Sequence, residues 1–433
     1  MLRTLDLRGR PPGSAIELPR PDLGGAEPVA AVREILAGVR ARGDAALREY
    51  TLAFDGVRLD ELRVDDAAVA AAPSRIDPDL RLALEAARDA VASFHEHRPS
   101  PPPPFRRAGI TVRRLDLPVE RVGVYAPGGR AKYPSSVLMT AVPARVAGVG
   151  AIACCVPPSP DGSVADELLA AAAIAGVDEV YRVGGAQAIG AMAYGTESIA
   201  KVDVVVGPGS RWVSIAQREV RGVVGVPAAF AGPSEVVVVA DASTPVDYAA
   251  IDLVVQAEHG PDGLAWLVTW SPAVAAAVRD AVARLVAASP RGEETSATLA
   301  QGGYAVLVDG PEEALAVANA IAPEHLELLT ADPEALVPLV RHAGAVFLGP
   351  LAPASIGDYL AGPSHVLPTF ATARFASALG VEDFVRRAHV IEVSTEGMEG
   401  AWRHVAALAT AEGLPAHAES VRLRAGRATW GAR

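Results

Sequence analysis

The 433-residue chain contains only two cysteines, Cys154 and Cys155, which are adjacent in the sequence. Two adjacent cysteines do not supply a disulfide framework, and without a nearby histidine they do not suggest a catalytic thiol. Aromatic residues make up 5% of the chain, too few for a surface that stacks on sugars or RNA bases. Runs of lysine or arginine are absent and the formal net charge is −12, so we expect no nucleic-acid partner.

Long uninterrupted apolar segments are also missing. The longest apolar stretch, residues 137–158, contains Arg145 and is predicted to form a helix, a loop and a strand rather than a membrane span. Residues 1–8 carry charges every few positions and have no apolar core, unlike a signal peptide. Half of the residues are hydrophobic and 21% are charged, as in ordinary globular proteins. We therefore expect a cytoplasmic protein of two or three domains with no membrane partner.

The chain alternates short β-branched segments with alanine-rich helical segments, which is the pattern of βαβ units in a parallel sheet. One such block covers residues 119–239, and a second covers residues 235–350. The expected strands include residues 122–125, 151–154, 179–183, 202–206, 236–240, 265–269, 304–308 and 345–348. Two doubly wound parallel-sheet domains are therefore the simplest α/β architecture for this chain.

Helical segments flank these two blocks. Residues 27–97 have helical periodicity and lead into the proline-rich run 98–104, which we interpret as a stiff hinge; a docking ligand for a proline-reading domain is the alternative. Residues from 372 onward are expected to be mainly helical, with a basic tail. We predict an N-terminal helical segment and hinge that packs with the second α/β domain (1–118), a first α/β domain (119–233), a second α/β domain (234–371) and a C-terminal helical segment (372–433).

Three glycine-containing loops each follow an expected strand, at residues 125–130, 183–187 and 206–210. Backbone amides at a helix start attract anions such as pyrophosphate, so these loops suggest a dinucleotide site. None has the Gly-x-Gly-x-x-Gly pattern, and each loop alone is equally well interpreted as a tight turn. Their succession within one sheet favours the binding interpretation.

The segment Gln256-Ala-Glu-His259 combines an amide with an imidazole. The residues before it predict a helix that begins near Pro245 and stops at Gly260-Pro261. Because residues three apart are neighbours on a helix, Gln256 and His259 can face one metal ion while Glu258 points elsewhere. A structural role for a single histidine near a helix end is the alternative.

Other acidic and histidine side chains also lie in segments punctuated by glycine and proline. Glu324 and His325 follow Pro323, which predicts a helix start with two bases in its first turn. Two adjacent bases suit a reaction with two proton transfers, whereas the alternative is a glutamate that only stabilises a helix N-terminus. Two more such pairs are Asp358 with His365, in a predicted loop, and Glu412 with His417, in a short turn.

Short motifs spread over most of the chain occur in a fixed order. They are Arg42-Gly-Asp-Ala-Ala-Leu, Tyr125-Ala-Pro-Gly-Gly, Tyr133-Pro-Ser-Ser-Val-Leu-Met, Gly184-Gly-Ala-Gln-Ala-Ile, Ala231-Gly-Pro-Ser-Glu, Gln256-Ala-Glu-His-Gly-Pro, Ala322-Pro-Glu-His-Leu-Glu, Gly357-Asp-Tyr, His365-Val-Leu-Pro-Thr and Glu412-Gly-Leu-Pro-Ala-His. Together these motifs closely resemble those of the histidinol dehydrogenase family. The resemblance implies two Rossmann-like domains in an intertwined homodimer. It also implies a zinc-dependent enzyme that oxidises L-histidinol through histidinal to L-histidine with two NAD, the final steps of histidine biosynthesis.

The resemblance assigns roles to individual positions. It implies that the zinc ligands are Gln256, His259, Asp358 and His417. The zinc ligands would share the substrate pocket with Ser234, His325, His365 and Glu412, while the NAD contacts would be Tyr125, Gln187 and Ser210. Nitrogen and carboxylate donors suit zinc, although a glutamine oxygen is an unusual ligand.

The resemblance also implies how the reaction proceeds. His325 would accept the hydroxyl proton as hydride leaves to NAD, and Glu324 would activate a water that attacks the aldehyde. His325 would again take a proton in the second oxidation, so that no cysteine adduct is required. The C-terminal segment with Glu412 and His417 would complete the site of the partner subunit.

Two positions depart from the family pattern. Ser210 and Ser364 stand where asparagine is common, which puts the NAD contact at Ser210 in question and implies a local change at Ser364. Two other interpretations stay open. A protein with the same scaffold could oxidise another small alcohol, such as a sulfonated diol, or could bind zinc without catalysis. The adjacent bases Glu324 and His325 favour an enzyme over the latter.

Overall fold

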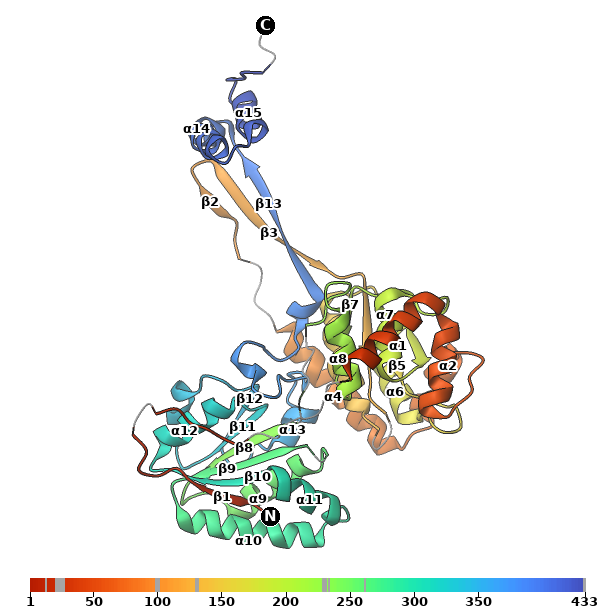
Figure 1. Ribbon diagram of the computed structural model, residues 1–433, viewed down its shortest axis with the longest axis vertical. Coiled ribbons are helices and arrows are strands. Elements are labelled where there is room, and N and C mark those ends of the chain that lie inside the picture. The colour runs from red at the N-terminus through yellow and green to blue at the C-terminus, as the bar shows by residue number, and fades with distance from the viewer. Residues whose placement is uncertain are drawn as a thin grey trace. The chain divides into compact units, whose positions relative to one another are not determined.

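The computed structural model describes residues 1–11, 14–19, 28–97, 102–128, 132–227, 232, 234–260 and 262–430. The chain divides into two compact units (Figure 1). The larger unit comprises Met1–His97 and Val119–Phe384, and the smaller unit comprises Arg98–Pro118 and Val385–Arg433. Among the described residues, no helix is both long enough and apolar enough to cross a membrane.

The first sheet of the larger unit is parallel and has the strand order β6-β5-β4-β7. Its strands are β4 (Arg121–Tyr125), β5 (Ala151–Val156), β6 (Glu179–Arg182) and β7 (Val204–Val206), and the helices between and after them are α5 (Pro134–Ala147), α6 (Asp166–Ile174), α7 (Gly185–Tyr194) and α8 (Arg211–Val220). Counted from β4, the order is 3-2-1-4, so the chain reverses direction across the sheet between β4 and β7. Doubly wound sheets bind ligands at such a reversal, beyond the carboxyl ends of the strands.

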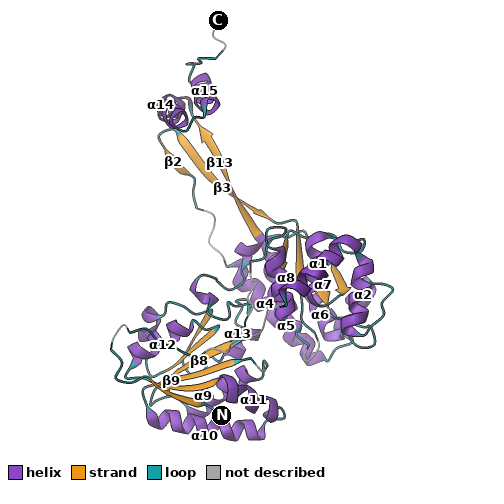
Figure 2. Ribbon diagram, in the orientation of Figure 1, coloured by secondary structure: helices purple, strands orange, loops and turns teal. Residues whose placement is uncertain are grey.

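The second sheet is also parallel and has the order β1-β10-β9-β8-β11-β12. Its strands are β1 (Arg3–Asp6), β8 (Glu235–Ala240), β9 (Leu264–Thr269), β10 (Gly303–Leu307), β11 (His325–Leu329) and β12 (Ala345–Leu348). The helices of this part are α9 (Val246–Ala257), α10 (Pro272–Ala288), α11 (Gly292–Gly302), α12 (Pro311–Ile321) and α13 (Ala354–Tyr359), with short 3-10 segments at η2 (Glu334–Leu339), η3 (Thr372–Arg374) and η4 (Val381–Phe384). Figure 2 shows helices beside the strands of each sheet.

The valines of β8 explain why this strand lies in the middle of the second sheet. Val236 and Val238 pack into one apolar core and Val237 and Val239 into another, so both faces of the strand are covered. A run of four β-branched residues is what a strand buried on both faces requires. The parallel α/β prediction is confirmed for both sheets, and every strand predicted in the two blocks is present within two residues of its expected bounds.

The N-terminal segment differs from the prediction that residues 1–118 pack with the second α/β domain. β1 does extend the second sheet, but α1 (Val29–Arg42) contacts α7 and α8, which flank the first sheet. The other N-terminal helices are α2 (Asp44–Asp55), α3 (Asp66–Ala71), η1 (Ala72–Ser74) and α4 (Pro78–Glu96), of which α4 packs on α5. Buried Val32, Leu36 and Val39 belong to the core beside β4–β7, because that stripe is the apolar face of α1.

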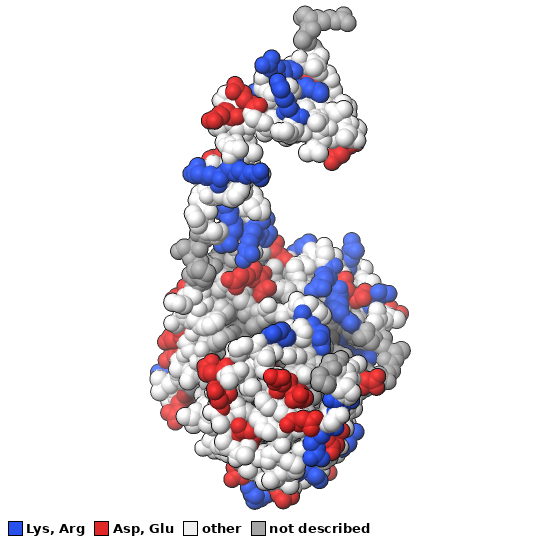
Figure 3. Space-filling model, turned by 90° about the vertical axis from the view of Figure 1, so that its left-hand side faces the viewer, with Lys and Arg blue, Asp and Glu red and all other residues white. Residues whose placement is uncertain are grey.

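The smaller unit contains an antiparallel sheet that the sequence patterns did not predict. β2 (Phe105–Arg107), β3 (Ile110–Pro118) and β13 (Val385–Val393) pair in the order β13-β3-β2. The expectation that residues 372–433 are mainly helical is therefore wrong for β13, and it is correct for α14 (Thr395–Ala411) and α15 (Pro415–Arg424). Blue arginine side chains gather over this sheet in Figure 3. Adjacent arginines, Arg113-Arg114 in β3 and Arg386-Arg387 in β13, interrupt the apolar alternation and conceal the strand pattern.

The proline-rich hinge can be compared with the structure only in part. Residues 98–101 lie outside the described residues, and residues 102–104 have no regular secondary structure. The predicted loop positions Gly129, Arg130, Ala231, Pro233 and Pro261 also lie outside the described residues.

Candidate active site

The acidic and histidine residues of the second sheet meet at its amino-terminal edge. Ser234 precedes β8, Glu324 precedes β11, and His325 is the first residue of β11, where it pairs with Val236. The helix α9 returns from the end of β8 to the start of β9, so its last turn with Gln256 reaches the same edge. The prediction of a helix start at Glu324 and His325 is wrong, because α12 ends at Ile321 and these residues open a strand.

The carboxylate of Glu324 is buried and held by hydrogen bonds. Its Oε2 accepts from the hydroxyl of Ser234 and, at 3.1 Å, from the backbone N–H of Glu235. The side chain of Glu324 is 10% exposed. These two donors hold the carboxylate of Glu324 in place beside His325.

His325 lies between two carboxylates. Its Nδ1 is 3.7 Å from Glu324 Oε2, and its Nε2 is 3.6 Å from Asp358 Oδ1, both longer than ordinary hydrogen bonds. Both ring nitrogens are buried, and neither has a hydrogen-bond partner among the described residues. Burial opposes the charged imidazole, but the charges of Glu324 and Asp358 outweigh it and raise the pKa of His325. The ring is therefore a stronger base than an ordinary histidine and has free nitrogens for a ligand.

Asp358 lies in the short helix α13 rather than in the predicted loop. Burial opposes its charge, but His325, His365 and His259 together lower its pKa, which indicates that three histidines lie around this carboxylate. His365 Nδ1 is 3.0 Å from the backbone oxygen of Asp358, and its Nε2 is 3.4 Å from the hydroxyl of Ser136. The structure thus brings together the predicted residues Asp358, His325 and His365.

The hydroxyl of Ser364 has a local structural role, which explains how a serine fits where the family commonly has asparagine. Its buried hydroxyl donates to the backbone oxygen of Met139 at 2.9 Å and accepts from the N–H of Val366 at 3.2 Å. These bonds fasten the loop before His365 to α5, which begins beside the first sheet. The substitution therefore affects how the loop is held and leaves the imidazole of His365 in the site.

The end of α9 provides donors that fit a metal ion. The side chain of Gln256 is buried, and its amide nitrogen has no hydrogen-bond partner. His259 follows the helix in a turn, exposed, with Nδ1 3.3 Å from the backbone oxygen of Val255, which leaves Nε2 available. A backbone contact of this kind orients a ligating imidazole. Amide oxygen, imidazole and the carboxylate of Asp358 are donors that suit zinc.

The remaining two predicted site residues belong to the smaller unit. Glu412 follows the last residue of α14, and His417 is the third residue of α15; both are exposed. The described part of the chain contains no group of three or more histidine, cysteine, aspartate or glutamate side chains arranged to hold a metal ion. Of the four predicted zinc ligands, Gln256, His259 and Asp358 belong to the larger unit and His417 belongs to the smaller unit.

The predicted NAD residues lie at the carboxyl ends of the first sheet. Tyr125 ends β4, Gln187 lies in the first turn of α7 after β6, and Ser210 precedes α8 after β7. The buried hydroxyl of Tyr125 accepts from the N–H of Gly185 at 3.2 Å, and burial raises its pKa to about 12. Ser210 is exposed and its hydroxyl does not cap α8. These positions flank the reversal between β4 and β7, where a nucleotide is expected.

Gly207 shows how closely the loop after β7 approaches the end of β4. Its φ is 118°, and a Cβ at this position would lie 2.0 Å from the backbone oxygen of Tyr125. The amide of Gln217 donates to the backbone oxygen of Gly207 at 2.9 Å and holds the loop from α8. Only glycine fits this approach.

Comparison with known proteins agrees with this arrangement. The family model for histidinol dehydrogenase matches residues 18–425. The chain belongs to the histidinol dehydrogenase family. It is 49% identical over 398 residues to a histidinol dehydrogenase from a Synechococcus strain, covering 91% of this chain and 92% of that protein. It is also 48% identical to a histidinol dehydrogenase from Moorella thermoacetica, covering 91% and 94% of the two chains. The crystal structure of histidinol dehydrogenase from Elizabethkingia anophelis matches with a TM-score of 0.91, 31% identity and 98% coverage of both chains.

Sequence reasoning missed several residues that lie near the candidate site. Ser136 stands in the Tyr133-Pro-Ser-Ser motif without an assigned role, yet its hydroxyl lies beside His365. Asp252 and Glu327 are buried near the assigned residues, at 8% and 0% exposure. A charged residue inside an otherwise apolar predicted helix is the signal that could have identified Asp252. Glu327 had no such signal, because its strand was not predicted.

Proposed function

We propose that this chain is a zinc-dependent histidinol dehydrogenase, which oxidises L-histidinol through histidinal to L-histidine with two NAD in the last steps of histidine biosynthesis. The observation that carries the proposal is the pairing of two different buried bases, Glu324 and His325, beside Asp358 at one edge of the second sheet. Membership of the histidinol dehydrogenase family supports the choice of substrate.

Four residues would hold the zinc ion: Gln256, His259, Asp358 and His417. A bound zinc supplies a Lewis-acidic centre that positions the amino and imidazole nitrogens of the substrate. Ser234, His365 and Glu412 would complete the substrate pocket with polar groups. The buried position of Gln256 at the end of α9 and the contact of His259 Nδ1 with Val255, which leaves Nε2 available, support this assignment.

His325 acts as the general base of each oxidation. Its raised pKa and free ring nitrogens suit removal of the hydroxyl proton of the alcohol as a hydride leaves to NAD. Glu324 faces His325, so it is placed to remove a proton from the water that attacks the aldehyde. His325 then takes the proton of the resulting gem-diol in the second oxidation. The adjacent positions of the two bases in the chain keep both within reach of one reacting carbon.

Tyr125, Gln187 and Ser210 contact NAD in this proposal. Their positions around the reversal between β4 and β7 support it. Ser210 is the departure from the family pattern, and its exposed hydroxyl is free of the helix cap. Restoring the longer amide in Ser210→Asn is expected to lower KM for NAD while kcat for histidinol changes little.

The test of the proposed activity is direct. Purified zinc-loaded protein with L-histidinol is expected to produce two NADH for each histidine formed. A failure to produce NADH would overturn the proposal, and turnover of a dihydroxypropane sulfonate in place of histidinol would move the chain to another small-alcohol substrate. Zinc uptake without turnover of either compound would indicate a binding protein.

The protein is proposed to act as a homodimer in which the smaller unit of one subunit completes the site of the other. Glu412 and His417 lie in that smaller unit, apart in sequence and in domain from the three other zinc ligands. The single variants Gln256→Ala and His417→Ala are each expected to be inactive. Mixed after dissociation, they should regain activity in hybrid dimers that contain one intact site. Demonstrated exchange of subunits without any recovery would refute shared sites.

A further inference from the structure

Two buried carboxyl groups lie directly behind the proposed zinc ligands. Glu327 is fully buried in the middle of β11, two residues after His325, so that both side chains project from the same face of the strand. Asp252 is buried on α9, one helical turn before Gln256 and two turns before His259. Neither residue has a role in the reaction described above.

Glu327 binds the start of α13. Its Oε1 accepts a hydrogen bond of 3.0 Å from the backbone N–H of Ala354, the first residue of that helix. Asp358 lies one turn further along the same helix, four residues after Ala354. The hydrogen bond therefore fixes the end of the short helix from which the carboxylate of Asp358 projects.

Asp252 is a close neighbour of the Glu327 carboxyl group. Oε2 of Glu327 is buried, and no group of the described residues donates to it. Asp252 belongs to α9, so its contact with Glu327 joins β11 to that helix. Burial comes first among the causes that raise the pKa of Glu327, followed by the neighbouring Asp252.

We propose that the buried carboxyl groups of Asp252 and Glu327 position the proposed zinc ligands by tying α9 to α13 through β11. The inference rests on the proposed zinc-dependent function. One side of the pair is one turn from Gln256, and the other side holds the helix of Asp358. Both are positioning residues, because they act through the ligands and touch neither substrate nor metal.

Substitutions separate the hydrogen bonds from the charges. Glu327→Gln retains an oxygen for the N–H of Ala354 and gains an N–H that can donate to Asp252, so zinc affinity should stay close to wild type. Asp252→Asn supplies the same N–H from the other side. Glu327→Leu and Asp252→Leu remove the connection, and each is expected to weaken zinc binding by about 10- to 100-fold, the usual effect of losing a group that orients a metal ligand.

The experiment measures zinc dissociation constants by chelator competition, independently of turnover. Amide hydrogen exchange of Ala354 provides a second measurement in the metal-free protein, where Glu327→Leu should lose protection and Glu327→Gln should keep it. The matched control is Asp44→Leu. Asp44 is a buried carboxylate that accepts from the backbone N–H of Ser198 at 3.3 Å beside the first sheet. Its loss should lower the melting temperature without changing zinc affinity.

The possible results are distinct. Rescue by both amide variants with failure of both leucine variants supports the pair. Equal zinc affinity in folded Glu327→Leu and wild type overturns it, as does Glu327→Gln binding zinc as weakly as Glu327→Leu. If the leucine variants do not fold, Glu327→Gln, Asp252→Asn and the exchange of the Ala354 amide decide the question. If the wild-type chain takes up no zinc, the proposed function fails first and the role of the pair fails with it.

Discussion

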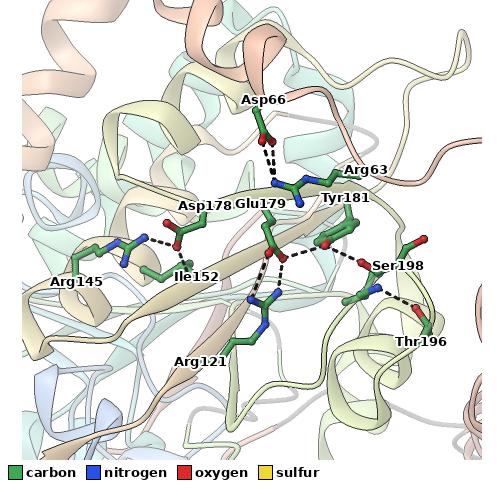
Figure 4. A network of polar contacts seen from close by, with 11 residues as sticks. Arg63, Asp66, Arg121, Arg145, Ile152, Asp178, Glu179, Tyr181, Thr196 and Ser198 are labelled. Atoms are coloured by element: carbon green, nitrogen blue, oxygen red, sulfur yellow. Dashed lines mark hydrogen bonds and ion pairs between the residues drawn. The ribbon is translucent and has the colours of Figure 1, made fainter.

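The amino-terminal edges of the two sheets carry similar residue types with opposite consequences. At the first sheet, Arg121 opens β4 and Glu179 opens β6, and the carboxylate of Glu179 is bound by Arg121 and, at 2.9 Å, by the hydroxyl of Tyr181 (Figure 4). At the second sheet, His325 opens β11 with both ring nitrogens unpartnered. A carboxylate whose partners are all present is a structural element, whereas buried polar atoms without partners identify a site that waits for a ligand.

At the carboxyl ends of the strands the contrast between the two sheets is reversed. The carboxyl ends of the first sheet lead into the loops with Tyr125, Gly207 and Ser210, as in other doubly wound sheets that bind nucleotides. In the second sheet the bases occupy the amino-terminal edge instead. Similar winding therefore does not dictate which edge performs chemistry, and each site has to be argued from its own residues.

The largest effect is expected at the second sheet, from His325→Asn. Loss of the general base should lower kcat for histidinol by about 10²–10⁴-fold while zinc affinity is retained. Steady-state NADH formation measures the first quantity, and chelator competition the second. The matched control is His342→Asn, in the same unit but before β12, which should leave both unchanged. A decrease in kcat no greater than that of the control would remove His325 from catalysis.

A second prediction concerns the loop after β7 in the first sheet, where the proposed NAD contacts lie. Gly207→Ala combines a left-handed φ with a Cβ that clashes with the backbone of Tyr125, at an expected cost of about 2–5 kcal/mol of unfolding free energy. KM for NAD should rise, whereas zinc affinity should not change, because three of the four proposed zinc ligands belong to the other sheet and the fourth to the smaller unit. Gly222→Ala is the control, since Gly222 also has positive φ, 95°, but open space around it. Equal effects of the two variants would contradict the importance of the close approach.

The smallest effect is expected at the amino-terminal edge of the first sheet, where Glu179 is bound by Arg121 and Tyr181. Burial opposes the charge of Glu179, but Arg121 and Tyr181 outweigh it and lower its pKa below the usual 4.5. A lowered pKa in the folded state contributes stability that is present above pH 4.5 and is lost as the pH falls through the folded value. Glu179→Gln should therefore reduce the unfolding free energy by roughly 1–2 kcal/mol at neutral pH, with a difference that shrinks in acid and no change in kcat.

Denaturant titrations of wild type and Glu179→Gln between neutral and acidic pH measure this difference. Glu219→Gln is the comparison variant, because Glu219 pairs with Arg33 on the surface and such pairs contribute little. A stability difference for Glu179→Gln that is constant with pH would show that the carboxylate charge is not what stabilises this edge.

Local patterns were sufficient for the strands and helices that are buried on one or both faces. The valines of β8 and the apolar stripe of α1 have periods that only one secondary structure accommodates. The strand β11 escaped prediction because Pro323 and Glu324 imitate a helix start, and pairing with β8 and β12 overrides that local preference. The strands of the smaller unit escaped because their arginines break the apolar alternation.

The sequence by itself determined the α/β class, the motifs of the histidinol dehydrogenase family and the identities of the residues proposed to bind zinc, substrate and NAD. These depend on residue type and order, which the chain states directly. The tertiary structure alone decided that the bases lie at the amino-terminal edge of the second sheet, that Ser136 meets His365, and that Asp252 meets Glu327. Each of these is a contact between residues far apart in the chain, and such contacts exist only after the strands have paired.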